Sequence, residues 1–248
     1  MLVKCKFLRN VATIVACLAV TAMYSGCNKD KDKDNGFGFG EDKEPTLGKA
    51  NFGTTLTLSG QVYTMTENAM DFYKKWNGNA TVYAYDTWDE NGDRTTGKIT
   101  KGELSFSIGQ PVPNSEIESL HTVEEIFGGW SQFMIDNNYD DVKYTPAGVR
   151  AFDLWWLDTE EYGSIVKQNE SISDQGMFLR EAIYIWVEKD VRLTAKGKKS
   201  SVGSYTEDID LPFKAGWNAV YKKHAWATDT PNLLKLGDPD LKWVINID

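Results

Sequence analysis

The chain has 248 residues, of which 41% are hydrophobic and 12% aromatic, and it carries a net charge of -9. This composition is typical of a folded globular protein and excludes disorder of the main body. The acidic balance excludes nucleic acid as an expected partner, because its phosphate groups would be repelled.

The N-terminal segment has the order basic, apolar, small, cysteine. Residues 1–10 carry three basic side chains and no acid, residues 11–23 carry no charge, and Ser-Gly-Cys27 follows after Tyr24. This order resembles the lipobox-type signal peptides of bacterial lipoproteins, although an aliphatic residue is usual at the position of Tyr24. The resemblance implies a signal peptide over residues 1–26 and a diacylglyceryl group on Cys27. It also implies a place in the bacterial cell envelope, with the outer membrane as the expected location.

Two other interpretations of this segment are an ordinary secretory signal and a single transmembrane helix. The uncharged run at 11–23 is shorter than the ~20 residues that a spanning helix needs, and a charged stretch follows it. An ordinary signal would not require the cysteine. Removal of residues 1–26 takes away three cations and leaves a net charge of -12. It also removes Cys5 and Cys17, so we expect no disulfide, thiolate metal site or cysteine nucleophile in the body of the protein.

The next segment has a different composition. Residues 28–44 read NKDKDKDN, GFGFG and EDKE with few large apolar side chains, which predicts a flexible tether over 27–44 and a folded domain over 45–248. Charged tracts of this kind direct some bacterial lipoproteins to the outer face of the membrane. A plain solvated spacer has the same composition, so the leaflet stays open.

From about Asn51 apolar and polar residues alternate with a period of two, which indicates half-buried strands. The clearest are residues 56–62 and 104–108, and a hairpin joins 79–87 to 97–99 across an Asn-Gly turn. The second half holds further short β-branched and aromatic blocks, at 149–157, 163–167, 182–187, 191–195, 204–211, 217–221 and 241–247. About ten strands predict an all-β fold, an antiparallel β-sandwich of jelly-roll or immunoglobulin-like type.

Helix signals are confined to two places. Thr122 and Glu125 have the spacing of a capping box, with an apolar face after them that Gly128 ends. A second short helix is expected around residues 68–76. We therefore expect one or two short helices beside the strands.

The nearest approach to a metal motif lies in the predicted hairpin turn. Asp89, Asn91 and Asp93 occupy the first, third and fifth positions of a calcium loop, but Arg94 stands where glycine is usual and Thr100 where the bidentate acid is usual. A polar hairpin tip explains the same residues without a metal. We expect weak calcium binding at most, and no cofactor.

Motifs for catalysis are missing from the sequence. His121 and His224 form no zinc-binding pattern, and there is no GxSxG, Walker or dinucleotide-binding motif. Four acids flank the tryptophan-rich strand, and a pair of carboxylates would suit glycoside hydrolysis, although a solvated face explains them equally: Asp153, Asp158, Glu160 and Glu161.

Nine tryptophans are the more informative feature. Trp155 and Trp156 are adjacent in a predicted strand and must point to opposite faces. Asp153 shares the face of Trp155, so we expect Trp156 in the core and Trp155 exposed. With Trp88 and Trp130, Trp155 is the candidate ligand-binding surface for sugar rings or a protein partner. Packing within the core is the alternative for all of them, above all for Trp186, Trp217 and Trp243.

The C-terminal part contains LPFKAGWNAVY at 211–221 and LKWVIN at 241–246. It resembles β-rich envelope lipoproteins of uncharacterised role, and the resemblance implies a β-sandwich edge and no chemistry. The sequence thus predicts a lipid-anchored, non-catalytic envelope protein with a binding or structural role. Its expected partners are the membrane, through the lipid, and a glycan or protein ligand. The alternatives are a carbohydrate-binding module with exposed tryptophans and an envelope glycoside hydrolase with paired carboxylates.

Overall fold

The computed structural model describes residues 44–65, 73–88, 94–111, 120–128, 133, 135–173, 176–199, 205–225 and 232–247. The described residues belong to one compact unit. Its first half contains β1 (Asn51–Gly53), β2 (Leu56–Met65), β3 (Tyr73–Lys75), β4 (Ala80–Trp88), β5 (Arg94–Thr100), β6 (Glu103–Ile108), β7 (His121–Thr122), α2 (Val123–Phe127) and α3 (Ile135–Asn138). Its second half contains β8 (Tyr139–Thr145), β9 (Arg150–Leu154), β10 (Leu157–Thr159), β11 (Ile165–Ser173), β12 (Gly176–Val187), β13 (Val191–Gly197), β14 (Ile209–Phe213), β15 (Gly216–Ala225), β16 (Leu233–Leu236) and β17 (Lys242–Ile245).

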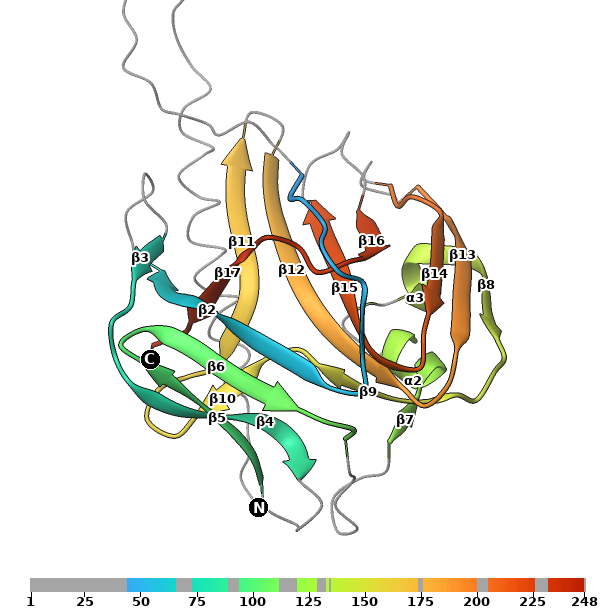
Figure 1. Cartoon of the computed structure of the whole chain (residues 1–248). Helices are drawn as coiled ribbons and strands as arrows, with labels where there is room; N and C mark the ends of the chain where they lie inside the picture. Colours follow the sequence, from blue (N-terminus) through green and yellow to red (C-terminus); the bar gives the residue numbers. More distant parts are fainter. Residues whose placement is uncertain are drawn as a thin grey trace, which may run out of the picture. The chain divides into compact units, whose positions relative to one another are not determined.

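Seven strands of the large sheet form a closed, barrel-like ring (Figure 1). Around the ring the order is β11, β10, β4, β5, β6, β2 and β17, and β17 pairs with β11 again. All these pairs are antiparallel except β17 with β2, which is parallel. Closure pairs the strand edges that an open sheet would leave unpaired.

The alternating pattern of the sequence places one face of each ring strand inside. Leu56, Leu58 and Val62 of β2 are buried in a first core, together with Phe106 of β6 and Val82 of β4. Their polar neighbours point outward, as the period of two requires. The ring is therefore filled by apolar side chains.

A glycine lets the last strand close against β2. Gly60 has φ +142, and a Cβ there would lie 3.2 Å from the Trp243 ring. The indole Nε1 of Trp243 donates a hydrogen bond to the Ser59 carbonyl at 3.2 Å. A side chain at position 60 would crowd this indole, and φ +142 is strained for residues other than glycine.

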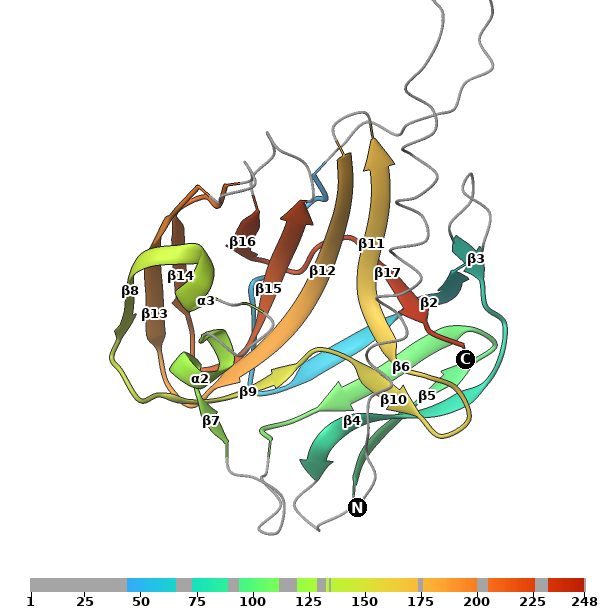
Figure 2. The ribbon, with the colours of Figure 1, turned by 180° about the vertical axis from the view of Figure 1, so that it is seen from behind.

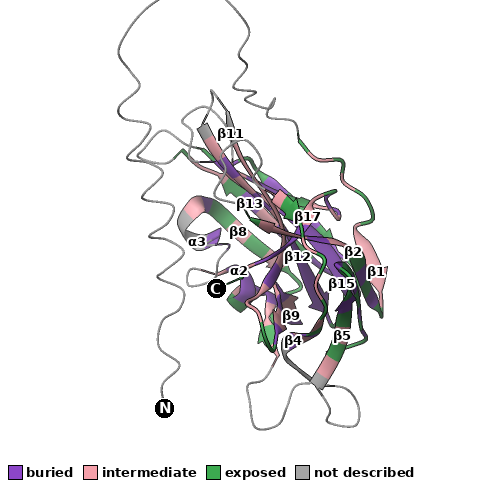
Figure 3. Ribbon diagram, turned by 90° about the vertical axis from the view of Figure 1, so that its left-hand side faces the viewer, coloured by how far each residue is buried: buried purple, intermediate pink, exposed green. Residues whose placement is uncertain are grey.

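Strands β12 and β15 separate two cores. Their continuous ladder runs from Phe178 opposite Ala225 to Val187 opposite Gly216. On β12, Tyr184 and Trp186 face the first core, whereas Ile183 and Ile185 face a second core on the opposite side. Buried residues accordingly run along both strands (Figure 3). Burial on both faces explains the uninterrupted apolar run at residues 182–187 of β12.

The second core is closed by a smaller layer. The three-stranded sheet β14-β13-β8 supplies Leu193, Leu211 and Phe213, and the short helices supply Phe127 and Ile135. In Figure 2 both helices lie on this side of β12. Helix α2 starts at Thr122, whose hydroxyl accepts a hydrogen bond from the Glu125 amide, and it ends at Gly128.

The structure confirms several predictions and corrects others. The all-β class and the capping box at Thr122 are confirmed. The fold is not specifically a sandwich, because the large sheet closes into a ring. Residues 73–75, expected in a helix, form strand β3 against β2. The strand expected over 149–157 is interrupted at 155–156, between β9 and β10.

Candidate functional site

Four charged or titratable side chains lie half-buried on the face of β11, β12 and β15 that also carries the second core. Glu181 of β12 is paired with Lys222 of β15, and Leu179 is paired with both His224 and Glu170. Residues two apart on a strand share a face, so all four side chains project to the same side. We call Glu170, Glu181, Lys222 and His224 the charged cluster.

The centre of the charged cluster is an ion pair. Nζ of Lys222 lies 3.1 Å from a carboxylate oxygen of Glu181, and the two side chains are only 18% and 17% exposed. The same ammonium group lies 4.8 Å from the ring centroid of Trp155. The pair is thus held between the sheet and an indole face, where water screens it weakly.

The flanking members titrate abnormally. Burial raises the pKa of Glu170 above its ordinary value, and the carboxylate of Glu181 adds to the shift. Burial lowers the pKa of His224, and Lys222 adds to that shift. Desolvated titratable groups gathered on one face are characteristic of binding and active sites. Together they place two carboxylates, an ammonium group and an imidazole on one half-buried face.

Trp155 corrects a prediction from the sequence. It was expected to be exposed, but it is 8% exposed and its ring stacks on Phe133, with centroids 5.6 Å apart. Trp156, expected in the core, is only partly buried. The cause is the break after Leu154: the two tryptophans lie outside a strand, so alternation does not assign their faces. Trp155 is thus unavailable for stacking on a sugar, although Trp186, Trp217 and Trp243 lie in the core as expected.

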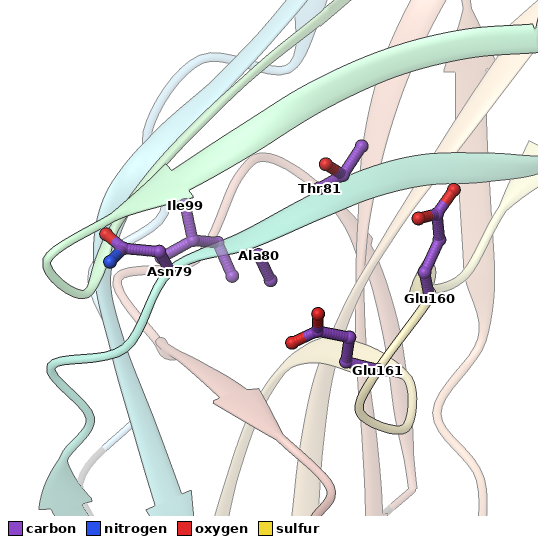
Figure 4. Close-up of a pocket in the computed structure, with 6 residues that line it drawn as sticks. All are labelled: Asn79, Ala80, Thr81, Ile99, Glu160 and Glu161. Atoms are coloured by element: carbon purple, nitrogen blue, oxygen red, sulfur yellow. The ribbon is translucent and has the colours of Figure 1, made fainter.

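A second candidate is an open hollow at the ring, with a volume of about 330 Å³. Glu160 and Glu161, which follow β10, face Asn79, Ala80 and Thr81 of the β4 region across it (Figure 4). Both glutamates are exposed to solvent. The hollow is therefore a solvent-exposed, acidic surface feature.

The four acids of the hydrolase alternative do not converge. Asp153 is opposite Ile185 and faces the side of the second core, where burial raises its pKa and the nearby His121 opposes that shift. Asp158 lies between two buried residues of β10 and therefore faces the outside of the ring. Glu160 lies in the turn beyond it. The geometry brings only the adjacent Glu160 and Glu161 to one place.

Several predicted site residues lie outside the described part of the chain. These are the lipidation residue Cys27, the calcium-loop residues Asp89, Asn91 and Asp93, and Trp130, together with the side chain of Trp88. Within the described ranges, no group of three or more acidic, histidine or cysteine side chains has a metal-binding arrangement.

Sequence reasoning missed the charged cluster. A local signal existed, because Arg180-Glu181 and Lys222-Lys-His224 place charged or titratable residues directly beside predicted strand regions. That signal does not say which strands become neighbours, so Glu170, Glu181 and Lys222 could not be combined from the sequence.

No protein-family model, curated protein or solved structure matches this chain. Among the described residues, no helix is both long and apolar enough to cross a membrane.

Proposed function

We propose that this chain is a non-catalytic binding protein of the bacterial cell envelope, attached to the outer membrane by a lipid on Cys27. The charged cluster is the observation that carries the binding role. Its ion pair is largely removed from water, and it offers oriented donors and acceptors on one face. The attachment rests on the N-terminal sequence pattern.

The proposed ligand is a polar molecule that hydrogen-bonds directly to the charged cluster, rather than a sugar stacked on exposed tryptophans. The burial of Trp155 supports this preference. We propose a sandwich arrangement around the second core alone. There the β14-β13-β8 sheet and the β9-β12-β15 region pack against each other and share one cluster of buried side chains.

The attachment is tested with Cys27→Ala. Two acyl chains suffice for stable anchoring, so the wild-type chain should stay with membranes after a carbonate wash. The variant should be released or remain unprocessed. A variant that is processed and still sediments with the membranes would contradict the lipid anchor.

The binding role is tested on a glycan array and by pull-down from envelope extracts. The double variant Glu181→Gln/Lys222→Met removes both charges of the central pair while keeping the side chains' approximate length. Arg192→Gln, in an exposed pair with Asp210, is the matched control. Wild type and control should capture the same ligand and the double variant should lose it; equal capture by all three would rule out the charged cluster as the site.

A further inference from the structure

The first described residues, 44–50, cross the face of β12 and β15 that lies opposite the charged cluster. We call these residues the arm. The arm pairs with residues 237–240 of the loop between β16 and β17, which we call the return loop. Amides of Gly48 and Asp238 donate to the carbonyls of Asp238 and Lys49 at 2.8 and 3.1 Å, and the Asp240 amide donates to Thr46 at 3.1 Å. In Figure 1 the blue arm and the dark-red return loop both run in front of β12.

The arm and the return loop each place one carboxylate on a tyrosine and a lysine. Asp238 of the return loop accepts hydrogen bonds from Tyr184 at 2.9 Å and Lys167 at 2.6 Å. Glu44 of the arm accepts hydrogen bonds from Tyr221 at 2.7 Å and Lys223 at 2.5 Å. The return loop is continuous with strands at both ends, whereas Glu44 is the first described residue of the arm.

The surface under Glu44 is strongly cationic. Arg180 lies directly opposite Lys223 in the β12–β15 ladder, and both residues are 3% exposed. Arg180 donates to the Ser171 hydroxyl at 2.6 Å and contacts the Tyr221 hydroxyl. Both cations also lie near the Phe178 ring, at 5.3 and 4.8 Å from its centroid. Two cations in a low-dielectric setting strongly favour a bound anion.

Apart from Glu44, the arm is held by its backbone hydrogen bonds to the return loop and to Ala219. None of its seven residues is buried, and the side chain of Glu44 is 44% exposed. Its first backbone hydrogen bond to a strand of the large sheet is the one from the Ala219 amide to the Ala50 carbonyl. Segments with few buried apolar contacts open at low free-energy cost, so the arm can leave without opening either core.

We propose that Lys223, Tyr221 and Arg180 form a carboxylate-binding cradle whose resident ligand is Glu44, and that the arm is a strap released when this carboxylate is lost or displaced. Release of the arm would also change how far the folded domain can lie from the membrane. This consequence rests on the proposed function, because the arm continues into the tether to Cys27. Release of residues 44–50 would lengthen that tether by about 23 Å at ~3.3 Å per extended residue.

The strap is tested by trypsin cleavage after Lys49 in the full chain, since a protease needs an undocked segment. Glu44→Gln should speed this cleavage at least about tenfold, because it removes a charge-assisted contact. Asp240→Asn is the control: it removes an exposed acid from the return loop. The melting temperature should fall by only a few degrees, because docking of the arm is one part of the stability of the folded state. Equal cleavage of the two variants, or cleavage of Glu44→Gln at sites within the two cores as fast as after Lys49, would overturn the strap.

The cradle is tested by chemical rescue of Glu44→Ala with sodium propionate, a small carboxylate. Propionate should raise the melting temperature of this variant above the effect of equal sodium chloride, and should have no such effect on wild type. Adding Lys223→Met should abolish the rise. No rise in Glu44→Ala, or the same rise in wild type, would refute the carboxylate site. Neither experiment needs the lipid, so a failure of the Cys27 anchor is separable from a failure of the cradle.

Discussion

At the scale of single residues, the two neighbouring tryptophans invert the expectation from strand alternation. Trp155 fills the edge of the second core and supports Lys222, while Trp156 is partly exposed. We predict that Trp155→Ala costs about 3–5 kcal/mol of the free energy of unfolding, as for other buried aromatic residues, and that Trp156→Ala costs clearly less. Urea unfolding of both variants measures the difference; a larger loss for Trp156→Ala would contradict the packing described.

His224 makes stability depend on pH. Its pKa lies below the usual 6.5 because burial and Lys222 disfavour the imidazolium in the folded state. As the pH falls below 6.5, the unfolded chain takes up the proton first, so this residue removes stability on acidification. This loss of stability is complete once the pH is below the pKa of His224 in the folded state.

We therefore predict that His224→Gln reduces the fall in melting temperature between about pH 7.5 and about pH 5. His121→Gln is the control, because the side chain of His121 is 51% exposed. Melting curves across this range give the answer. A pH profile unchanged by His224→Gln would mean that the imidazole titrates equally in both states.

At the scale of elements, helix α2 depends on its capping box. The Thr122 hydroxyl accepts from the Glu125 amide at 3.2 Å, and the Glu125 carboxylate accepts from the Thr122 amide at 2.6 Å. The helix has five residues, so its stability comes from these caps and from the burial of Val123, Ile126 and Phe127.

Thr122→Ala should cost about 0.5–2 kcal/mol, because it leaves a helix amide without its acceptor. Chemical denaturation provides the measurement. Thr57→Ala, on the outer face of β2, is a control with an exposed hydroxyl. A loss no larger than the control's would show that burial alone holds the helix.

The elements also show why sequence reasoning succeeded in part. Strands β2 and β6 alternate cleanly because only one of their faces is buried, so their existence and inward residues were predictable. The contact that closes the ring could not be predicted, because the parallel pairing of β17 with β2 joins Trp243 to Val62 across most of the chain. The cradle could not be predicted for the same reason, because Glu44, Arg180 and Lys223 come together only when distant segments pair in the folded chain.

At the scale of the whole molecule, the charged cluster and the cradle lie on opposite faces of the same two strands. Lys222 and Lys223 are adjacent on β15, and their side chains therefore point to opposite sides. One ladder thus supports both the proposed ligand site and the proposed attachment of the arm.

The same two strands should make the two cores unfold together. Phe106 belongs to the first core and Phe127 to the second, and neither is more than 1% exposed. Phe106→Ala and Phe127→Ala should each cost about 3–5 kcal/mol, a large share of a typical total of ~5–15 kcal/mol.

Since β12 contributes Ile183 to one core and Tyr184 to the other, opening either core exposes the ladder that closes its neighbour. Circular dichroism and tryptophan fluorescence should therefore report one coincident unfolding transition in wild type and in both variants. An early fluorescence transition confined to Phe127→Ala, with the strand signal retained, would mean that the second core unfolds alone. In that case the ladder would be a boundary between two independent units rather than the element that joins them.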